Sequence, residues 1–75
     1  MKREPKALCE RIGQRIRERR ESLRMSLDDL AERIEMSKTG LWQIEQGRSE
    51  PMAGTILRLC IVLGLSADKL LGVND

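Results

Sequence analysis

The sequence predicts an all-α fold, a compact bundle of five short helices. No segment shows the alternation of apolar and polar residues that a strand requires. The 75 residues include only two Pro and a single aromatic residue, Trp42, and the abundant Leu, Arg, Glu, Ile and Met favour helices. Each apolar periodic segment is bounded by a local start or stop signal. The length allows one domain, residues 1–75, with one core.

The first helix is expected from Pro5 to about Leu23. Proline suits the first turn of a helix, where its missing N–H group has no partner to lose. Leu8, Ile12, Ile16 and Leu23 then lie on one apolar stripe. Most of the remaining positions are charged, which is typical of a helix on the surface of the bundle.

The second helix is expected to begin after Ser26, which is a good N-cap residue. Asp29 follows three residues later, so the pair resembles a capping box. A short link at Glu35 and Met36 ends this helix. The predicted buried face consists of Leu27, Leu30, Ala31 and Ile34.

A third helix is capped by Ser37 and turns Leu41 and Ile44 inward. Gly47 ends it in the left-handed conformation that helix ends favour. After a turn at Pro51, a fourth helix runs from residue 52 or 53 to 63 and is stopped by a glycine. A fifth, short helix over residues 67–71 has a serine cap before it and a glycine after it.

Charge and composition narrow the classes of function. Nine basic and four acidic residues lie between Lys2 and Arg24, which fits a nucleic-acid partner or simply a solvated helix face. The chain has no His and two distant cysteines, Cys9 and Cys60, so no metal site and no cofactor are expected; a small buried side chain is favoured over a redox role for Cys60. No membrane span or signal peptide is evident, and a cytoplasmic protein is expected.

The most informative stretch is residues 26–47, where two short helices are separated by only a few residues. Leu41 and Ile44 alone tie the second of them to the core, and small Ala31 suits a close helix crossing. This arrangement lets one helix support another that offers polar side chains to a groove. The stretch from Ile12 to Leu71 resembles the lambda-repressor-like family of helix-turn-helix domains, of the Cro and xenobiotic-response-element type. The segments that carry the resemblance are Ile16-Arg17, Arg20, Leu23, Ser26-Leu27-Asp28-Asp29-Leu30-Ala31, Leu41-Trp42-Gln43-Ile44-Glu45-Gln46-Gly47-Arg48, Pro51, Thr55-Ile56-Leu57-Arg58-Leu59, Leu63-Gly64-Leu65-Ser66 and Asp68-Lys69-Leu70-Leu71.

The resemblance implies that residues 38–46 form a recognition helix in the major groove of duplex DNA. Lys38, Thr39 and Gln43 match the family's base-reading positions: Gln43 suits adenine, Lys38 suits guanine and Thr39 offers a hydroxyl and a methyl group. The alternative is that these three residues are simply solvated polar side chains on a surface helix. The sequence leaves two orientations open for Trp42. Its side chain can contact DNA, or it can fold back over the first or second helix as a core-edge residue.

Phosphate contacts are expected at the two ends of the motif and carry no sequence information. Ser26 and the backbone N–H groups near Leu27 present partial positive charge at a helix start, although many relatives have Gln at the Leu27 position. Ser37 caps the recognition helix, and Arg48 and Ser49 follow it.

The resemblance also implies a bridge between Arg20 and Glu45, which would orient the recognition helix; the alternative is two unrelated surface charges. Arg24 and Glu35 stand where glycine is common, so a left-handed conformation at either would cost on the order of 1 kcal/mol. Gly40 lies inside the recognition helix, where it costs about 1 kcal/mol relative to Ala.

A homodimer is expected because the fourth helix has almost no polar face. Only one side of a short helix can enter this core, so Ile61 or Val62, with Leu65 nearby, should face out, and these three are the predicted interface residues. Relatives without a separate oligomerisation domain often pair through the region of residues 52–71. The alternative is that this helix is simply central to the bundle. A two-fold dimer selects a palindromic site with half-sites ~34 Å apart.

The predicted function is a sequence-specific regulator of transcription, a repressor or autoregulator that binds double-stranded DNA as a homodimer. The alternative is a protein-binding adaptor or antitoxin that keeps the scaffold but has little affinity for DNA. An enzyme is not expected, because no nucleophile with a base, carboxylate pair or phosphate-binding loop is present. No small-molecule ligand and no membrane partner are expected.

Overall fold

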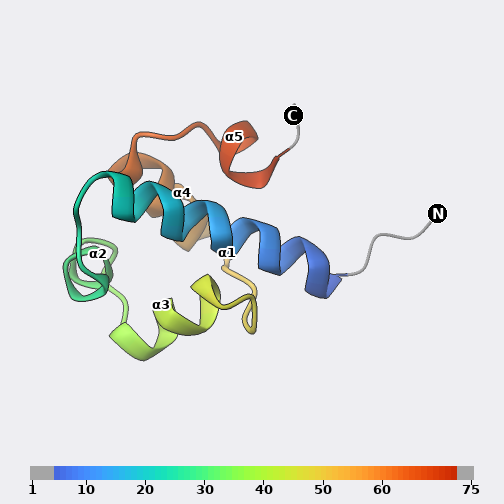
Figure 1. Ribbon diagram of the computed structural model, residues 1–75, viewed down its shortest axis with the longest axis horizontal. Coiled ribbons are helices and arrows are strands. Elements are labelled where there is room, and N and C mark those ends of the chain that lie inside the picture. Colours follow the sequence, from blue (N-terminus) through green and yellow to red (C-terminus); the bar gives the residue numbers. More distant parts are fainter. Residues whose placement is uncertain (1–4, 73–75) are drawn as a thin grey trace.

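The computed structural model describes residues 5–72, which are all-helical apart from the connecting turns. Five helices follow one another in the order that the sequence predicts (Figure 1). None of the helices in this part of the chain is long and apolar enough to cross a membrane. The helices are α1 (Pro5–Ser22), α2 (Leu27–Arg33), α3 (Lys38–Glu45), α4 (Ala53–Leu63) and α5 (Ala67–Leu71).

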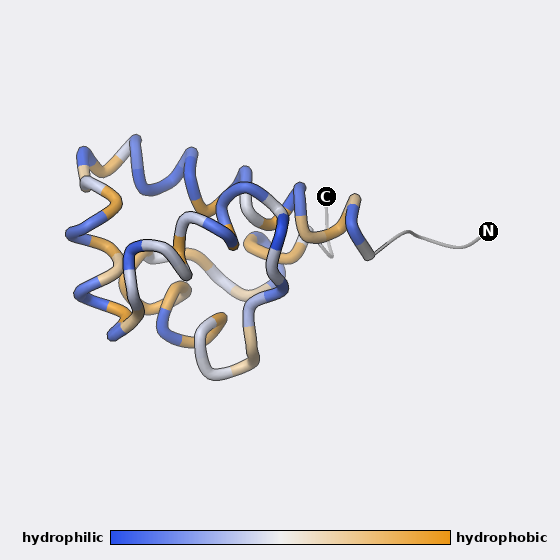
Figure 2. The backbone as a smooth tube through the Cα atoms, turned by 90° about the horizontal axis from the view of Figure 1, so that it is seen from below, coloured by the Kyte–Doolittle hydropathy of each residue, from blue (hydrophilic) through white to orange (hydrophobic). Residues whose placement is uncertain are grey.

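The long helix α1 organises the bundle, with α3 on one side of it and α5 on the other in Figure 1. It packs against α3, α4 and α5, while α2 packs against α3. Hydrophobic residues recur along its inner side, and most of its outer edge is hydrophilic (Figure 2). The buried apolar side chains come from all five helices and from Ile34 just after α2: Ile12, Ile16, Leu30, Ala31, Ile34, Leu41, Ile44, Leu59, Leu63 and Leu70.

Serine hydroxyls start three of the helices, as the sequence predicts. Ser26 accepts a hydrogen bond from the backbone N–H of Asp29 at 3.0 Å, and the Asp29 carboxylate accepts one from the N–H of Ser26 at 3.2 Å. This reciprocal pair is a complete capping box. Ser37 and Ser66 cap α3 and α5 with the hydroxyl half of this motif alone, accepting a hydrogen bond from the backbone N–H of Gly40 and of Lys69. Met52 precedes α4 and makes no side-chain capping bond, so α4 begins without the stabilisation that a serine cap provides.

The ends of α1, α2 and α3 share one hydrogen-bonding pattern. In each, two N–H groups beyond the helix bond back to carbonyls of its last turn, as in a Schellman motif. The residue that turns left-handed is Gly47 after α3, with φ 75°, but Arg24 after α1 and Glu35 after α2, with φ 59° and 57°. Because a side chain disfavours this conformation, each non-glycine residue costs on the order of 1 kcal/mol.

The placement of Leu23 on the buried stripe was wrong. Helix α1 ends at Ser22, and Leu23 is 41% exposed. The left-handed turn at Arg24 ends the helical periodicity, and Met25 after it packs against the core instead. The apolar stripe of α1 is therefore completed from outside the helix.

Gly13 allows α1 and α3 to approach closely. A Cβ atom at this buried position would collide with the carbonyl oxygen of Ile44 and would lie 2.7 Å from that of Glu45. A similar limit applies at Gly47, where a Cβ would lie 2.7 Å from the Cα of Glu10. Two glycines thus fix the separation between the long helix and α3, which carries the predicted site.

Candidate nucleic-acid interface

Helix α3 has one face in the core and one outside it. Leu41 and Ile44 are 0% and 1% exposed, so they anchor the helix. Lys38 and Thr39 are exposed and Gln43 is half-buried. Figure 1 places α3 at the periphery of the bundle, so its far side faces away from α1. The three polar residues that the sequence selects are therefore available from outside.

Lys38 contacts the neighbouring helix of the motif. Its Nζ atom lies 3.6 Å from a carboxylate oxygen of Asp28 in the first turn of α2. Both side chains are more than half exposed, at 61% and 70%, and exposed pairs of this kind contribute little to stability. Lys38 can therefore leave Asp28 for another acceptor at small cost.

Arg20 and Glu45 form a two-pronged ion pair between α1 and α3. The Nε atom of Arg20 donates to one carboxylate oxygen of Glu45 at 2.8 Å, and an Nη atom donates to the other at 3.0 Å. The other Nη donates to the carbonyl oxygen of Met25 at 2.9 Å. The hydrogen bonds to Glu45 raise the pKa of Arg20. Side-chain exposure is only 13% for Arg20 and 3% for Glu45, so the last turn of α3 is fixed to α1 by charge as well as packing.

Trp42 lies outside the core, with 38% of its surface exposed. The guanidinium carbon of Arg48 sits 5.1 Å from the centroid of the indole ring, within the range of a cation–π contact. Arg48 and Ser49 are exposed in the turn after α3. Trp42 and Arg48 are both site residues predicted from the sequence, but no sequence pattern predicts that their side chains contact each other.

The residues predicted to contact phosphates at the starts of α2 and α3 differ in which of their atoms are still available to bind one. The hydroxyl oxygens of Ser26 and Ser37 already accept capping hydrogen bonds, although each hydroxyl hydrogen remains available to donate. Leu27 is half-buried against the core, so only its backbone can serve a phosphate. Asp28 and Asp29 stand in the same first turn, where their charge opposes the positive end of the α2 dipole.

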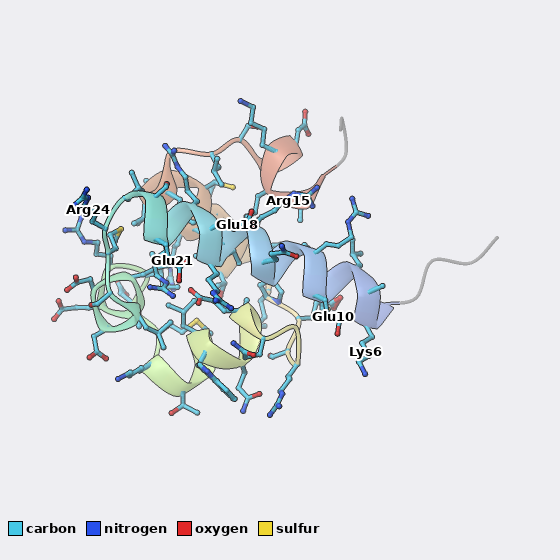
Figure 3. All side chains as sticks on the ribbon, viewed as in Figure 1. Lys6, Glu10, Arg15, Glu18, Glu21 and Arg24 are labelled. Carbon is cyan, nitrogen blue, oxygen red and sulfur yellow. The ribbon has the colours of Figure 1, made fainter. Side chains whose placement is uncertain are left out.

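Basic and acidic residues alternate on the surface of α1. Figure 3 shows charged side chains along the whole helix, with Glu18 and Glu21 between Arg15 and Arg24. Arg17 pairs with Glu21 at 3.4 Å, with both side chains more than half exposed. Pairs of this spacing are typical of solvated helix surfaces. The basic excess of this segment therefore does not form a uniform basic face.

The predicted interface residues on and after α4 are placed differently from one another. Ile61 is 71% exposed, whereas Val62 and Leu65 are partly buried and pack against the protein's own core. Leu57 is 62% exposed and lies one helical turn before Ile61, on the same face. Sequence reasoning missed Leu57; the deeply buried Leu59 and Leu63 set the phase of α4 and could have identified it.

Cys60, also on α4, is partly buried against the core. Burial raises the pKa of its thiol, which favours the protonated, less reactive form.

Comparison with known families identifies the class of this protein. A family model described as a helix-turn-helix domain matches residues 11–71, so the chain belongs to the helix-turn-helix domain family. The five-helix arrangement and the α2–α3 pair agree with this assignment. The resemblance to lambda-repressor-like domains found in the sequence is thereby confirmed.

Solved structures of transcriptional regulators share the fold. The clp gene regulator ClgR from Corynebacterium glutamicum is 31% identical, with a TM-score of 0.81 over 85% of this chain and 68% of that chain. The restriction-modification controller protein C.AhdI from Aeromonas hydrophila is 26% identical, with a TM-score of 0.80 over 85% of this chain and 97% of that chain. The biofilm regulator SinR, solved in complex with DNA, is 34% identical, with a TM-score of 0.75 over 80% of this chain and 97% of that chain. A search of curated protein sequences gave no significant match.

Proposed function

We propose that this protein is a sequence-specific regulator of transcription that reads duplex DNA with helix α3. The observation that carries the proposal is the two-sided character of α3. Its buried face is locked by packing and by the Arg20–Glu45 pair, while its polar face is open to solvent. A rigid helix with an open polar face is what insertion into a major groove requires.

The chemistry of that face suits base recognition. The amide of Gln43 can donate to and accept from one adenine edge at the same time, and the ammonium of Lys38 can donate to guanine O6 and N7. Thr39 offers a hydroxyl and a methyl group. Lys38 would exchange its exposed contact with Asp28 for a base, which requires no buried group to be opened.

Contacts to the DNA backbone are proposed for the residues that flank α3. Arg48 and Ser49 are exposed immediately after the helix. Ser26, Leu27 and Ser37 are proposed to add backbone N–H or hydroxyl donors at the starts of α2 and α3. Asp28 and Asp29 weaken the positive potential at the start of α2. We therefore propose that the phosphate contacts of Arg48 and Ser49, after α3, are stronger than those at the start of α2.

The base-reading proposal is tested with Lys38→Ala and Gln43→Ala on a duplex selected from a random library and on a scrambled duplex. Each variant should lose about 1–3 kcal/mol of affinity for the selected site, with a much smaller loss on the scrambled one. Arg17→Ala is the control for charge, because it removes one positive charge from a similarly exposed ion pair on α1, outside residues 26–47 and 52–71. Equal losses in Lys38→Ala and Arg17→Ala would mean that the loss reflects net charge alone, which would contradict base reading.

A homodimer through α4 is the second part of the proposal, with residues 26–47 as the DNA-binding motif and residues 52–71 as the pairing region. Leu57 and Ile61 support it, because they form an exposed apolar stripe one turn long. Val62 and Leu65 would contribute only the parts of their side chains that the core leaves uncovered.

Ile61→Glu tests the dimer by sedimentation. Because Ile61 is 71% exposed, the variant should remain folded but sediment as a monomer and lose cooperative binding to a palindromic site. Leu23→Glu is the matched control, since it places the same charge on another exposed apolar residue. If the unsubstituted protein sediments as a monomer both in free solution and when bound to DNA, this part of the proposal is contradicted.

A further inference from the structure

The side chain of Arg48 is held against α3 by Trp42. The guanidinium carbon lies 5.1 Å from the ring centroid, while both residues remain exposed. Trp42 cannot turn inward, because its neighbours Leu41 and Ile44 occupy the buried positions of the helix. The indole therefore presents a face at the surface, and Arg48 covers part of that face.

The backbone of Arg48 is fixed as well. Its N–H group donates to the carbonyl oxygen of Gln43 at 2.9 Å, and the N–H of Gly47 donates to that of Ile44 at 3.0 Å. With Gly47 in the left-handed conformation, these bonds close the end of α3. The backbone bonds fix where the side chain of Arg48 starts and the ring contact favours one position of its guanidinium group, so less rotamer freedom is lost on binding.

The contact with the ring leaves the guanidinium N–H groups of Arg48 without a hydrogen-bond acceptor among residues 5–72. A guanidinium that lies over an aromatic face keeps its N–H groups in its own plane, where they can form paired hydrogen bonds to a phosphate. Within residues 5–72 Arg48 forms no ion pair with a carboxylate. The group is oriented and charged, and it lies one residue past the base-reading helix.

We propose that Trp42 is a positioning residue that holds Arg48 ready for a phosphate of the DNA backbone, rather than a residue that reads a base. The inference rests on the proposed function of α3. It assigns the indole face to Arg48, so Trp42 contributes to affinity equally for all sequences. Gln43, next to it in the chain, keeps the reading of the base edge.

The test measures binding to the selected and the scrambled duplex for four substitutions. Trp42→Ala should weaken both complexes by about three- to fivefold, the size of an exposed cation–π contact. Trp42→Phe should keep most of the affinity, because it retains an aromatic face, whereas Trp42→Leu should behave like Trp42→Ala. In an Arg48→Ala background, Trp42→Ala should have no further effect.

A spectroscopic measurement checks the contact without DNA. Trp42 is the only aromatic residue in the chain, so tryptophan fluorescence reports the surroundings of this one residue. Arg48→Ala should change the emission of the free protein while its circular dichroism spectrum shows that the protein stays folded. An unchanged emission spectrum would overturn the contact on which the inference depends.

The remaining outcomes separate the inference from the proposed function. If Trp42→Ala changes which base pair is preferred at one position, Trp42 reads a base and the inference is overturned, while the proposed function stands. Additive losses from Trp42→Ala and Arg48→Ala would also overturn the inference alone. If the unsubstituted, folded protein binds neither duplex, the proposed function fails and the role of Trp42 fails with it.

Discussion

Arg20 and Glu45 meet through two hydrogen bonds, of 2.8 and 3.0 Å, that join the last turns of α1 and α3. Glu45 is the one charged residue among the buried side chains of residues 5–72. The pair spans 25 positions of sequence, so it forms only when the two helices are already packed. A carboxylate held at two points cannot rotate freely, and we propose that the pair fixes the direction of α3.

Removal of one partner should cost more than removal of both. Arg20→Met leaves the carboxylate of Glu45 buried without its partner and should lower the free energy of unfolding by roughly 3 kcal/mol. The double variant Arg20→Met/Glu45→Met replaces both charges with apolar groups and should recover most of that loss. Urea unfolding followed by circular dichroism measures both values. Additive losses in the double variant would show that the pair is not coupled.

Two helical glycines should respond in opposite directions to the same substitution. Nothing lies within 4 Å of a Cβ atom built at Gly54, so Gly54→Ala should stabilise the protein through helix propensity, by less than the ~1 kcal/mol of a helix interior because Gly54 lies in the first turn of α4. At Gly13 the Cβ would meet the backbone of Ile44 and Glu45, which cannot move aside as a side chain can. Gly13→Ala should therefore destabilise by about 1–3 kcal/mol. Thermal unfolding of the two variants provides the comparison; stabilisation by Gly13→Ala would contradict the close contact of α1 and α3.

The capping box of α2 should give the stability of the protein an acid-dependent component. Hydrogen bonds from Ser26 hold the pKa of Asp29 below its usual value of 3.8. A lowered pKa means that the folded state favours the carboxylate, so this stabilisation is present above pH 3.8 and is lost as the pH falls through the lower folded value.

The variant Asp29→Asn should therefore be less stable than the unsubstituted protein near neutral pH, with a difference that narrows in acid. Unfolding midpoints across the acid range measure this difference. Glu32→Gln is the control, because it removes a charge from the exposed surface of the same helix without touching the cap. A gap between Asp29→Asn and the unsubstituted protein that stays constant with pH would contradict the role of the carboxylate.

Local signals predicted most of the helix boundaries. Ser26, Ser37 and Ser66 start helices through contacts within three residues, and Gly47 and Gly64 end helices through their own conformation. Such contacts depend on adjacent residues alone, so the sequence contains what is needed to recognise them.

The features that the sequence did not reveal depend on how the helices pack. Leu23 continues the periodicity of α1, and only the left-handed turn at Arg24 removes it from the core. In the sequence, Gly13 is only a residue of low helix propensity within a predicted helix. Its role in the close approach of α1 and α3 is visible only when the two helices are packed. The interface assignment of Ile61, Val62 and Leu65 stays a prediction. The sequence left open whether Ile61 or Val62 faces out, because the rotation of α4 is set by its contacts with other helices.

In the candidate site too, the features set by local sequence are predictable and those set by tertiary contacts are not. The polar positions of α3 are predictable from the spacing of Leu41 and Ile44, which leaves Lys38, Thr39 and Gln43 outside. The sequence alone left two orientations open for Trp42. The position of Arg48 over its ring depends on the turn after α3, where left-handed Gly47 brings the chain back along the helix.

The most direct test of the central claim is selection of binding sites from a random duplex library at about 150 mM salt, where non-specific binding to phosphates is weak. The account predicts enrichment of a palindrome whose half-sites are about one helical turn, ~34 Å, apart. If protein shown to be folded enriches no motif, α3 does not read DNA, and the exposed stripe of Leu57 and Ile61 would instead favour a protein-binding adaptor.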